Sequence, residues 1–403
     1  MERVTELCTG CRACEQLCAH HAISMIADKE GFLTASVNHD LCVDCGLCRL
    51  RCPQNDHIDK HEPILSLAVR DKNDEELYKS ASGGAFAAAA RVILQRGGVV
   101  VGAAYNDDFS VSHITIDNLD DLPKLQSSKY VQSNTEATFL QVREFLRANR
   151  EVLYSGTSCQ IAGLKAFLHR EYAKLYTMDL ICHGVASPKL FAKYLVWLSG
   201  KMNGKIIGYD FRDKSCGWGL DYMTKTKTKT KTKTKTKTKT KTKTKTKTKP
   251  STLDPYYFHF LEGNTYRECC YNCRYCTKER VGDITIGDYW GIEKEHPKFY
   301  STKGVSCLLV NNEQGIRLWD RISSEFFSLE STFEKVSRAN RNLSYPTQRK
   351  LIRNNIYNGI DEMDANEYIA TQLKIPLNLK ARIKRLLPKC VKVLVKNCYM
   401  RNN

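Results

Sequence analysis

The sequence predicts an α+β/α/β protein, in which a small cysteine-rich domain precedes a larger α/β domain with a mixed sheet and a mostly helical basic tail. Two observations support this fold class. Eight cysteines fall within the first 52 residues, and from Ser66 onward strand-like segments alternate with helix-like segments. A chain of 403 residues has room for both domains, each with its own core.

The N-terminal cysteines repeat one spacing, C-x2-C-x2-C-x3-C. The first copy is Cys8, Cys11, Cys14 and Cys18, and the second is Cys42, Cys45, Cys48 and Cys52. Such a run gives three ligands to one [4Fe–4S] cluster and its fourth cysteine to a neighbouring cluster. We therefore expect one cluster on Cys8, Cys11, Cys14 and Cys52, and another on Cys42, Cys45, Cys48 and Cys18. The stretch resembles a bacterial dicluster ferredoxin domain, although Ala19 replaces the proline that usually follows the first copy.

Zinc and disulfides explain these cysteines less well. Zinc sites take their ligands in two pairs, whereas this run groups them three and one. Disulfides need an oxidising compartment, and the sequence starts Met-Glu-Arg-Val without the apolar run of a secretory signal. No stretch reaches the ~18 consecutive apolar residues of a membrane span. We therefore expect reduced thiols, metal binding and a cytoplasmic location.

The net charge of +18 does not indicate nucleic acid binding. Residues 224–249 are thirteen Thr-Lys units, and without them 49 basic residues face 44 acidic ones, a net charge of +5. Fully extended, this repeat would span on the order of 85 Å, far longer than a strand of a compact domain. We expect most of it to be disordered, as an expanded hairpin or loop without a function of its own. The alternative is that its period-two alternation adds a few residues to an edge strand, with the lysines outward.

Apolar runs and turn residues place the elements of the larger domain. Strands are expected at 64–70, 99–105, 112–117, 151–154, 175–181, 206–212, 283–288 and 305–311. Helices are expected at 85–95, 136–149, 161–169, 188–198 and 256–261. Gly97-Gly98 ends the first helix and Pro188 begins the fourth. Beyond residue 311 the pattern is helical and weak.

These elements and the composition set the domain boundaries. We expect a cluster domain at 1–56, a linker at 57–65, the larger domain at 66–223 and 250–345, the repeat at 224–249 and the tail at 346–403. From Lys380 to Arg401 the tail carries eight basic residues among leucines and valines. They indicate the solvated face of a terminal helix, which we favour because Pro388 breaks the pattern, or a peripheral contact with anionic lipid.

A second set of cysteines lies in the larger domain. Cys159 falls between a strand and the N-terminus of a helix, where backbone N–H groups favour a thiolate, and Cys182 follows the next strand. If these strands are parallel neighbours, both side chains emerge at the carboxyl edge of the sheet, where α/β proteins place their sites. The loop from Cys269 to Cys276 adds thiols at 269, 270, 273 and 276. Spacing alone leaves a third [4Fe–4S] cluster and a zinc site open.

Seven segments make the larger domain similar to the coenzyme F-420 hydrogenase/dehydrogenase beta-subunit family. They lie at 82–86, 97–102, 128–132, 155–163, 179–185, 211–213 and 283–291. The resemblance runs from about Ser66 to Pro346, behind a ferredoxin domain as in many bacterial members. It implies FAD and a nearby [4Fe–4S] cluster on Cys159, Cys182, Cys270 and Cys273. Cys276 is the rival for the fourth position, Cys269 is a bystander, and Cys216, Cys307, Cys390 and Cys398 are single thiols outside the ligand set.

The resemblance also implies flavin-binding residues. Ser82, Gly83 and Gly84 precede a helix, where backbone N–H groups can approach a pyrophosphate, although a tight helix start also explains the glycines. Ser128, Lys129 and Tyr130 form a second segment, in which Lys129 either counters a phosphate or reduced-flavin charge or is an ordinary exposed lysine. His183 beside Cys182 is the candidate catalytic residue, as a proton relay, with a hydrogen-bonded structural histidine as the alternative.

These features predict an iron–sulfur flavoprotein oxidoreductase that passes electrons between a ferredoxin-like partner and an organic hydride acceptor or donor. A flavin is needed because clusters move one electron at a time and a hydride carries two. The alternative is an electron-transfer subunit of a larger redox complex with no substrate site of its own. The family name implies the deazaflavin coenzyme, and many bacterial members lie among surface-polysaccharide genes, so the small-molecule substrate stays open.

Overall fold

The computed structural model describes residues 7–55, 58–215, 217–234 and 237–376, and these residues form two compact units. The first unit holds the described residues up to Lys189 together with Tyr266–Arg349. The second holds Leu190–Thr265 and the described residues from Lys350 onward. The sequence-based boundaries, which divide the larger domain at the repeat, do not coincide with this division. The basic segment from Lys380 lies outside the described residues.

The small N-terminal domain has the α+β structure that its cysteine motifs predict. Its elements are α1 (Ala13–Leu17), β1 (Ile23–Ala27), β2 (Leu33–Val37) and α2 (Leu47–Leu50), with β1 and β2 antiparallel. Each short helix lies within one copy of the cysteine motif. In each copy the residue after the second cysteine, Arg12 or Gly46, has a left-handed backbone, with φ of 65° and 71°. The two copies therefore turn in the same way at the same place.

The larger domain of the first unit is built on a mixed sheet of eight strands in the order β13-β3-β12-β11-β7-β6-β4-β5. Its strands are β3 (Leu65–Asp71), β4 (Val99–Tyr105), β5 (Val111–Ile116), β6 (Val152–Thr157), β7 (Leu175–Leu180), β11 (Ile284–Asp288), β12 (Ser306–Val310) and β13 (Phe326–Glu330). The central strands β4, β6, β7 and β11 are parallel, and the outer ones pair antiparallel. The predicted α/β class with a mixed sheet is confirmed.

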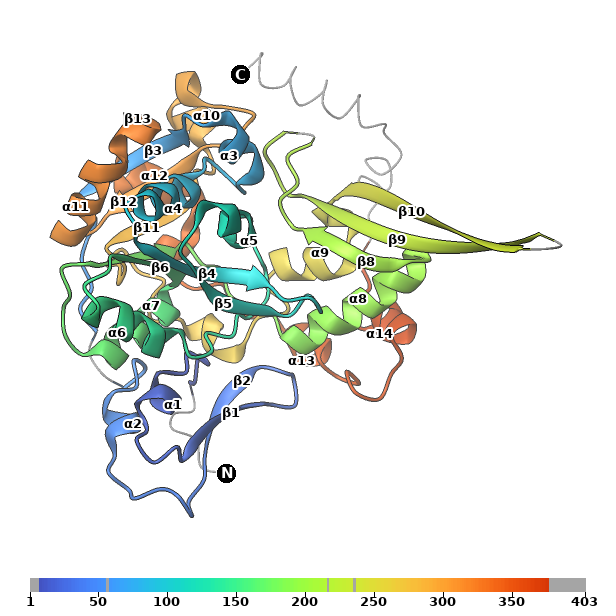
Figure 1. The fold of residues 1–403 in the computed structure, drawn as a ribbon, viewed down its shortest axis with the longest axis horizontal. Helices are drawn as coiled ribbons and strands as arrows, with labels where there is room; N and C mark the ends of the chain where they lie inside the picture. The colour runs from blue at the N-terminus through green and yellow to red at the C-terminus, as the bar shows by residue number, and fades with distance from the viewer. Residues whose placement is uncertain (1–6, 56–57, 216, 235–236, 377–403) are drawn as a thin grey trace. The chain divides into compact units, whose positions relative to one another are not determined.

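Alternate residues of the central strands face two separate cores. Val100 and Leu153 belong to one core, which includes α4 (Ala85–Gln95) and α11 (Glu313–Ile322). Val101 and Tyr154 belong to the other, which includes α6 (Thr138–Arg147) and α7 (Ser158–Leu168). Figure 1 shows α4 and α11 on one side of the sheet and α6 and α7 on the other. Because both faces are covered, the central strands read as continuous apolar runs.

The small domain packs on the α7 side of the sheet. Its residues Cys11 and Ala13 are members of the core that contains α7. The Gln132 side chain donates to the Thr9 carbonyl (3.3 Å) and accepts from the Leu33 backbone N–H (3.0 Å). The first unit is completed by α3 (Asp74–Lys79), α5 (Leu122–Leu125), α10 (Ile292–Glu295), α12 (Phe333–Ala339) and the 3-10 turns at Leu119–Asp121, Glu268–Asn272, Pro297–Phe299, Ser323–Glu325 and Arg341–Leu343.

The second unit is organised around buried aromatic rings and one buried carboxyl group. Its elements are α8 (Pro188–Met202), β8 (Lys205–Asp210), β9 (Asp221–Thr234), β10 (Lys237–Pro250), a 3-10 turn (Ser251–Leu253), α9 (Pro255–Leu261), α13 (Arg353–Ile356) and α14 (Ala365–Thr371). Asp254 caps α9 by accepting from the Tyr257 N–H (2.8 Å), and it also accepts from the Tyr194 hydroxyl (2.5 Å). Burial raises the pKa of this carboxyl group.

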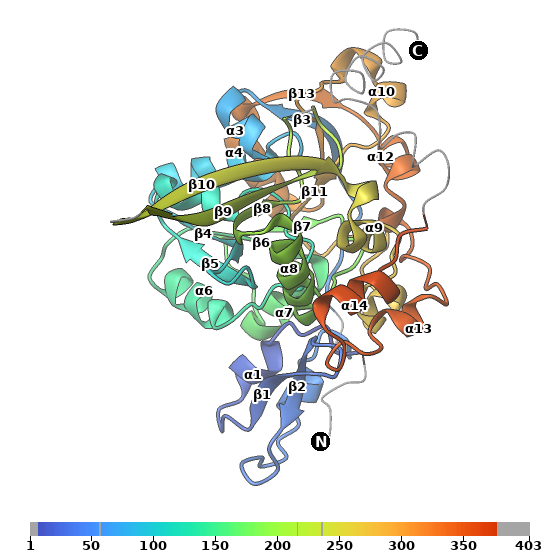
Figure 2. The ribbon, with the colours of Figure 1, turned by 90° about the vertical axis from the view of Figure 1, so that its right-hand side faces the viewer.

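The Thr-Lys repeat lies in the antiparallel hairpin of β9 and β10, beside β8 (Figure 2). We expected most of it to be disordered, as an expanded hairpin or loop, and the structure has regular strand pairing. The register places a threonine of one strand across from a lysine of the other, as at Lys245 and Thr226. Like charges directly opposite one another destabilise a sheet, and this register avoids them.

Candidate functional site

Four cysteines from both copies of the N-terminal motif line one cavity. Cys8, Cys11 and Cys14 come from the first copy and Cys52 from the second, and they surround about 330 Å³, part of it open to solvent. This is the set that the crossed ligand pattern predicts for one cluster. The Gly10 backbone N–H donates to the Cys8 sulfur (3.4 Å), a contact of the kind that tunes cluster sulfurs.

The chemistry of this donor set fits a cluster. Burial raises the pKa of Cys11 to about 12, and the neighbouring thiols Cys8 and Cys52 act in the same direction. Burial also raises the pKa of Cys14 and of Cys52. Thiolates in this place therefore need a positively charged partner, and the irons of a [4Fe–4S] cluster would be that partner.

The second predicted cluster site lies nearer to solvent. Cys45 is exposed, and the apolar side chains Leu41, Val43 and Leu50 beside it are 50–62% exposed. Cys48 has its pKa raised by burial and then by Cys42 and Cys45. Cys18 packs with Cys48 against the same apolar cluster, and its sulfur accepts from the Ala22 N–H (3.4 Å). The structure thus places the four cysteines of this set in one part of the small domain.

Cys159 and Cys182 emerge at one edge of the large sheet. Strands β6 and β7 are parallel neighbours, which confirms the condition on which this expectation rested, and their register pairs Thr157 with Leu180. Cys159 lies two residues after Thr157, and Cys182 lies two residues after Leu180. Thr157 caps α7 through a capping box with Gln160, so Cys159 lies in the first turn of the helix.

Six cysteines line a second cavity at this edge. They are Cys159, Cys182, Cys269, Cys270, Cys273 and Cys276, and the cavity encloses about 620 Å³, part of it open to solvent. Burial raises the pKa of Cys182 to about 12, while a hydrogen bond from Cys276 lowers the pKa of Cys273 to about 7. The Thr157 hydroxyl lies 3.2 Å from the Cys159 sulfur. Sequence reasoning regarded Cys269 as a bystander, and the structure places its thiol on the cavity wall with the others.

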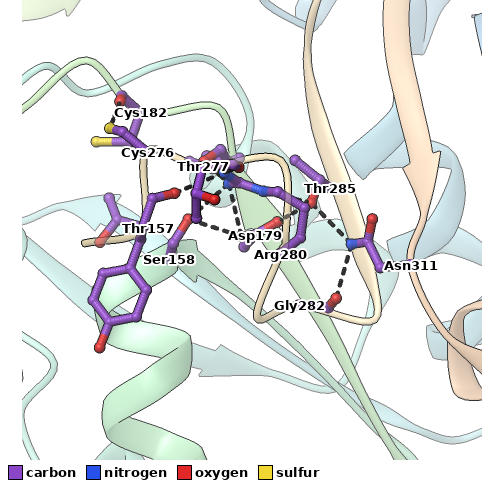
Figure 3. Close-up of polar contacts among 12 residues, drawn as sticks. Thr157, Ser158, Asp179, Cys182, Cys276, Thr277, Arg280, Gly282, Thr285 and Asn311 are labelled. Atoms are coloured by element: carbon purple, nitrogen blue, oxygen red, sulfur yellow. Dashed lines mark hydrogen bonds and ion pairs between the residues drawn. The ribbon is translucent and has the colours of Figure 1, made fainter. Parts of the chain in front are cut away.

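A buried arginine lines this cavity, and Figure 3 shows it with its polar partners. The Arg280 side chain is about 2% exposed and forms an ion pair with Asp179, which is fully buried (2.9 Å). Sequence reasoning assigned neither residue a role. The sequence did hold one signal: Asp179 is a charged residue within the apolar strand 175–181, and a buried charge requires a partner of opposite charge.

The two cavities adjoin each other. Thr9 and Gln54 line both of them. The Tyr275 hydroxyl, in the cysteine loop of the second cavity, donates to the Pro53 carbonyl next to Cys52 (2.9 Å). A Cβ on Gly163 in α7 would lie 2.9 Å from the Cys11 sulfur, so only glycine permits this approach. Helix α7 thus carries Cys159 in its first turn and contacts Cys11 one turn later.

The segments predicted to bind flavin have local structural roles. The Gly83 N–H donates to the Ser306 hydroxyl (2.9 Å), and an added Cβ would lie 2.3 Å from the Ser306 backbone nitrogen. The Ser82 hydroxyl donates to the Val305 carbonyl (2.8 Å). The Lys129 ammonium donates to the carbonyls of residues 124, 126 and 127. These groups are therefore engaged within the protein. Gly84 caps α4, and Ser128 and Tyr130 flank Lys129.

The remaining candidates have simpler placements. His183 lines the six-cysteine cavity, and its carbonyl accepts from the Thr347 hydroxyl (3.0 Å). Cys307 is buried in β12, as expected of a single structural thiol, whereas Cys216, Cys390 and Cys398 lie outside the described residues. Among the residues that the structure describes, no three His, Cys, Asp or Glu side chains converge on a single metal ion. In the same part of the chain no helix is long and apolar enough to cross a membrane.

Comparisons with known proteins match both parts of the chain. Residues 149–334 match the family described as the C terminus of the beta subunit of coenzyme F420 hydrogenase/dehydrogenase, and residues 7–55 match the 4Fe-4S dicluster domain. Matching solved structures include a chain of the F420-reducing [NiFe] hydrogenase complex from Methanosarcina barkeri, 18% identical over 77% of this chain and 90% of that chain, with a TM-score of 0.44. No curated protein matches the chain. Every cysteine of the two cavities falls within the matched residues.

Proposed function

Because residues 149–334 match the coenzyme F420 hydrogenase/dehydrogenase beta-subunit family and residues 7–55 match the 4Fe-4S dicluster domain, we propose that the chain is a cytoplasmic iron–sulfur flavoprotein oxidoreductase. It passes electrons between a ferredoxin-like redox partner and an organic hydride acceptor or donor. Iron–sulfur clusters supply one-electron transfer, and FAD would convert between one electron and a hydride.

The observation that carries this proposal is the shared wall between the two thiol-lined cavities. Thr9 and Gln54 line both, so clusters held in the two cavities would be neighbours. Two redox centres can exchange electrons only when they lie close together. This adjacency supports an electron path from the small domain to the six-cysteine cavity.

We assign three ligand sets. The first is Cys8, Cys11, Cys14 and Cys52, the second is Cys42, Cys45, Cys48 and Cys18, and the third is Cys159, Cys182, Cys270 and Cys273. Cys276 is the alternative in the third set, since its thiol bonds to Cys273 and lies 3.9 Å from the Cys182 carbonyl. The exposed Cys45 makes the second set the one nearest to a partner protein.

The flavin is the part of the proposal that rests on the family alone. Gly83 and Lys129 are bonded within the protein, so we assign no step to FAD and no contact to these residues. That same observation favours the second candidate function, an electron-transfer subunit of a larger complex without a substrate site of its own. His183 is kept as the candidate proton relay, because it lines the six-cysteine cavity.

The test is the iron, acid-labile sulfide, zinc and flavin content of the chain purified without oxygen. About twelve iron and one FAD per chain are expected for three clusters and a flavin. About twelve iron without flavin favours the electron-transfer subunit. About eight iron with zinc in the six-cysteine cavity refutes the third cluster and with it the proposed path.

A further inference from the structure

The six cysteines of the second cavity come from three separate segments of the chain. One is the first turn of α7, with Cys159, and another is the end of β7, followed by Cys182. The third is the loop 269–276, which lies close to a hundred residues later in the sequence. Something must hold these three segments at fixed positions, because a metal cluster accepts ligands in one geometry only.

The Arg280 guanidinium contacts all three segments (Figure 3). Its Nη2 atom donates to the Ser158 hydroxyl (2.9 Å), one residue before Cys159, and to the Asp179 carboxylate (2.9 Å), three residues before Cys182. Its Nη1 atom donates to the Tyr275 carbonyl (2.8 Å), one residue before Cys276. An arginine has five N–H donors spread over three nitrogen atoms of a planar group, whereas a lysine has three donors on a single atom and cannot reach partners so far apart.

Asp179 holds the guanidinium in place and is itself fully bonded. Its Oδ2 atom also accepts from the Ser158 hydroxyl (2.7 Å), and its Oδ1 atom accepts from the Thr285 hydroxyl. The Nε atom of Arg280 donates to the same Thr285 hydroxyl (3.2 Å). The Arg280 backbone is fixed as well, through a pair of hydrogen bonds with His61 (2.8 and 2.9 Å). Both side chains are therefore held by several hydrogen bonds.

We infer that Arg280, held by Asp179, is the positioning residue of the six-cysteine site, which joins its three cysteine-bearing segments and places a fixed positive charge beside the metal group. Arg280 lines the cavity directly, whereas Asp179 does not. The positive charge is therefore nearer to the cavity than the negative charge that balances it. Charge and hydrogen bonding around a cluster set its reduction potential, so this pair acts on assembly and on potential. The inference rests on the proposed third cluster.

The test measures iron content and the reduction potential of each cluster by EPR-monitored titration in three variants. Arg280→Gln removes the charge and the fork, and we expect the iron content to fall from about twelve toward about eight while the signals of the two N-terminal clusters persist. In the fraction that retains the third cluster, its potential falls. Asp179→Asn keeps the shape and removes the negative charge, so the potential rises. Arg280→Lys keeps the positive charge but not the fork, so the third cluster should have the potential of the unaltered chain while the iron content is only partly retained.

Arg91 provides the matched control. It forms a buried ion pair with Asp71 (3.1 Å) in the same unit, and neither residue lines either thiol cavity. Arg91→Lys should leave the iron content and all potentials unchanged, and a loss of iron equal to that of Arg280→Lys would overturn the inference. Full iron content in Arg280→Gln, or potentials that shift in the same direction in Arg280→Gln and Asp179→Asn, would also overturn it.

A failure of the proposed function looks different from a failure of this inference. An unaltered chain with about eight iron has no third cluster, and the proposed path then fails before any variant is made. An unaltered chain with about twelve iron whose Arg280 variants behave like the unaltered chain keeps the path and refutes the positioning role alone. If Arg280→Gln does not fold, Arg280→Lys and Asp179→Asn still decide the question.

Discussion

Replacing Gly163 by alanine should disrupt the first cluster site from the opposite side of the domain boundary. A Cβ at this position would lie 2.8 Å from the Cys11 Cβ and 2.9 Å from the Cys11 sulfur. Both distances are shorter than real carbon contacts, so Cys11 or helix α7 must shift. Since Cys11 is a proposed ligand that packs in the core with α7, we expect the cluster on Cys8, Cys11, Cys14 and Cys52 to be lost.

The energetic cost is the difference between two terms. Overpacking a tight core costs about 1–3 kcal/mol. Alanine in place of glycine in a helix contributes about 1 kcal/mol in the opposite direction. The net loss of stability is therefore about 0–2 kcal/mol, so the variant should still fold. The iron content, in contrast, should fall from about twelve to about eight per chain.

Gly200 in α8 is the matched control, because an alanine Cβ there meets nothing within 4 Å. Gly200→Ala should keep all its iron and gain up to about 1 kcal/mol. Iron analysis and urea denaturation of the two variants and the unaltered chain make the comparison. If Gly163→Ala keeps its iron and unfolds at the same urea concentration as Gly200→Ala, the close packing of Cys11 on α7 is refuted.

Three further predictions follow from burial and register. Burial lowers the pKa of His113 to about 4, so near pH 5 the unfolded state binds a proton that the folded state does not. The free energy of unfolding should therefore fall by about 2 kcal/mol from pH 7 to pH 5. Urea denaturation at the two pH values should show this fall, and His113→Gln should lack it. After iron is removed with a chelator, the exposed Cys45 should be alkylated before Cys159, whose pKa is raised by burial, as mass spectrometry would report. Equal rates would contradict the raised pKa of Cys159. Replacing residues 230–241 by an Asn-Gly turn keeps all pairing between β8 and β9, so iron and flavin content should not change, and a loss of either would give the repeat a role.

The sequence was most informative where a pattern is local. The cysteine spacing predicts which thiols share a cavity, because in this motif the fourth cysteine of each copy binds the cluster of the other copy. The central strands β4 and β7 and the helix α4 follow from apolar runs and the glycines at 97 and 98, and α4 and β4 begin and end where the sequence predicts. The family resemblance and the α/β class are confirmed by the matched residues and the eight-stranded sheet.

The sequence was least informative where long-range contacts decide. Strand β13 has one buried residue, Phe326, and four more exposed ones, so its apolar pattern is too weak to distinguish an edge strand from a helix. Arg280 and Asp179 lie a hundred residues apart, and nothing in either local pattern pairs them. Gly83 looks like the start of a phosphate-binding helix in the sequence, but its close approach to Ser306 explains the glycine by packing.

Part of the second unit, Leu190–Thr265, is inserted in the sequence of the first, and this determines the order in which the cysteines of the two cavities are synthesised. Residues up to 52 carry all eight cysteines of the two proposed N-terminal sites, so both sets of thiols are complete early in translation. The six-cysteine site has Cys182 just before the chain leaves the first unit and Cys269 just after it returns, and a backbone bridge between Ala186 and Tyr266 joins the two ends. The whole Thr-Lys repeat must therefore be synthesised before all six cysteines of this cavity are present in the chain. If translation pauses in that repeat, Cys159 and Cys182 are already present on the nascent chain while the cysteines of the loop 269–276 are not yet synthesised.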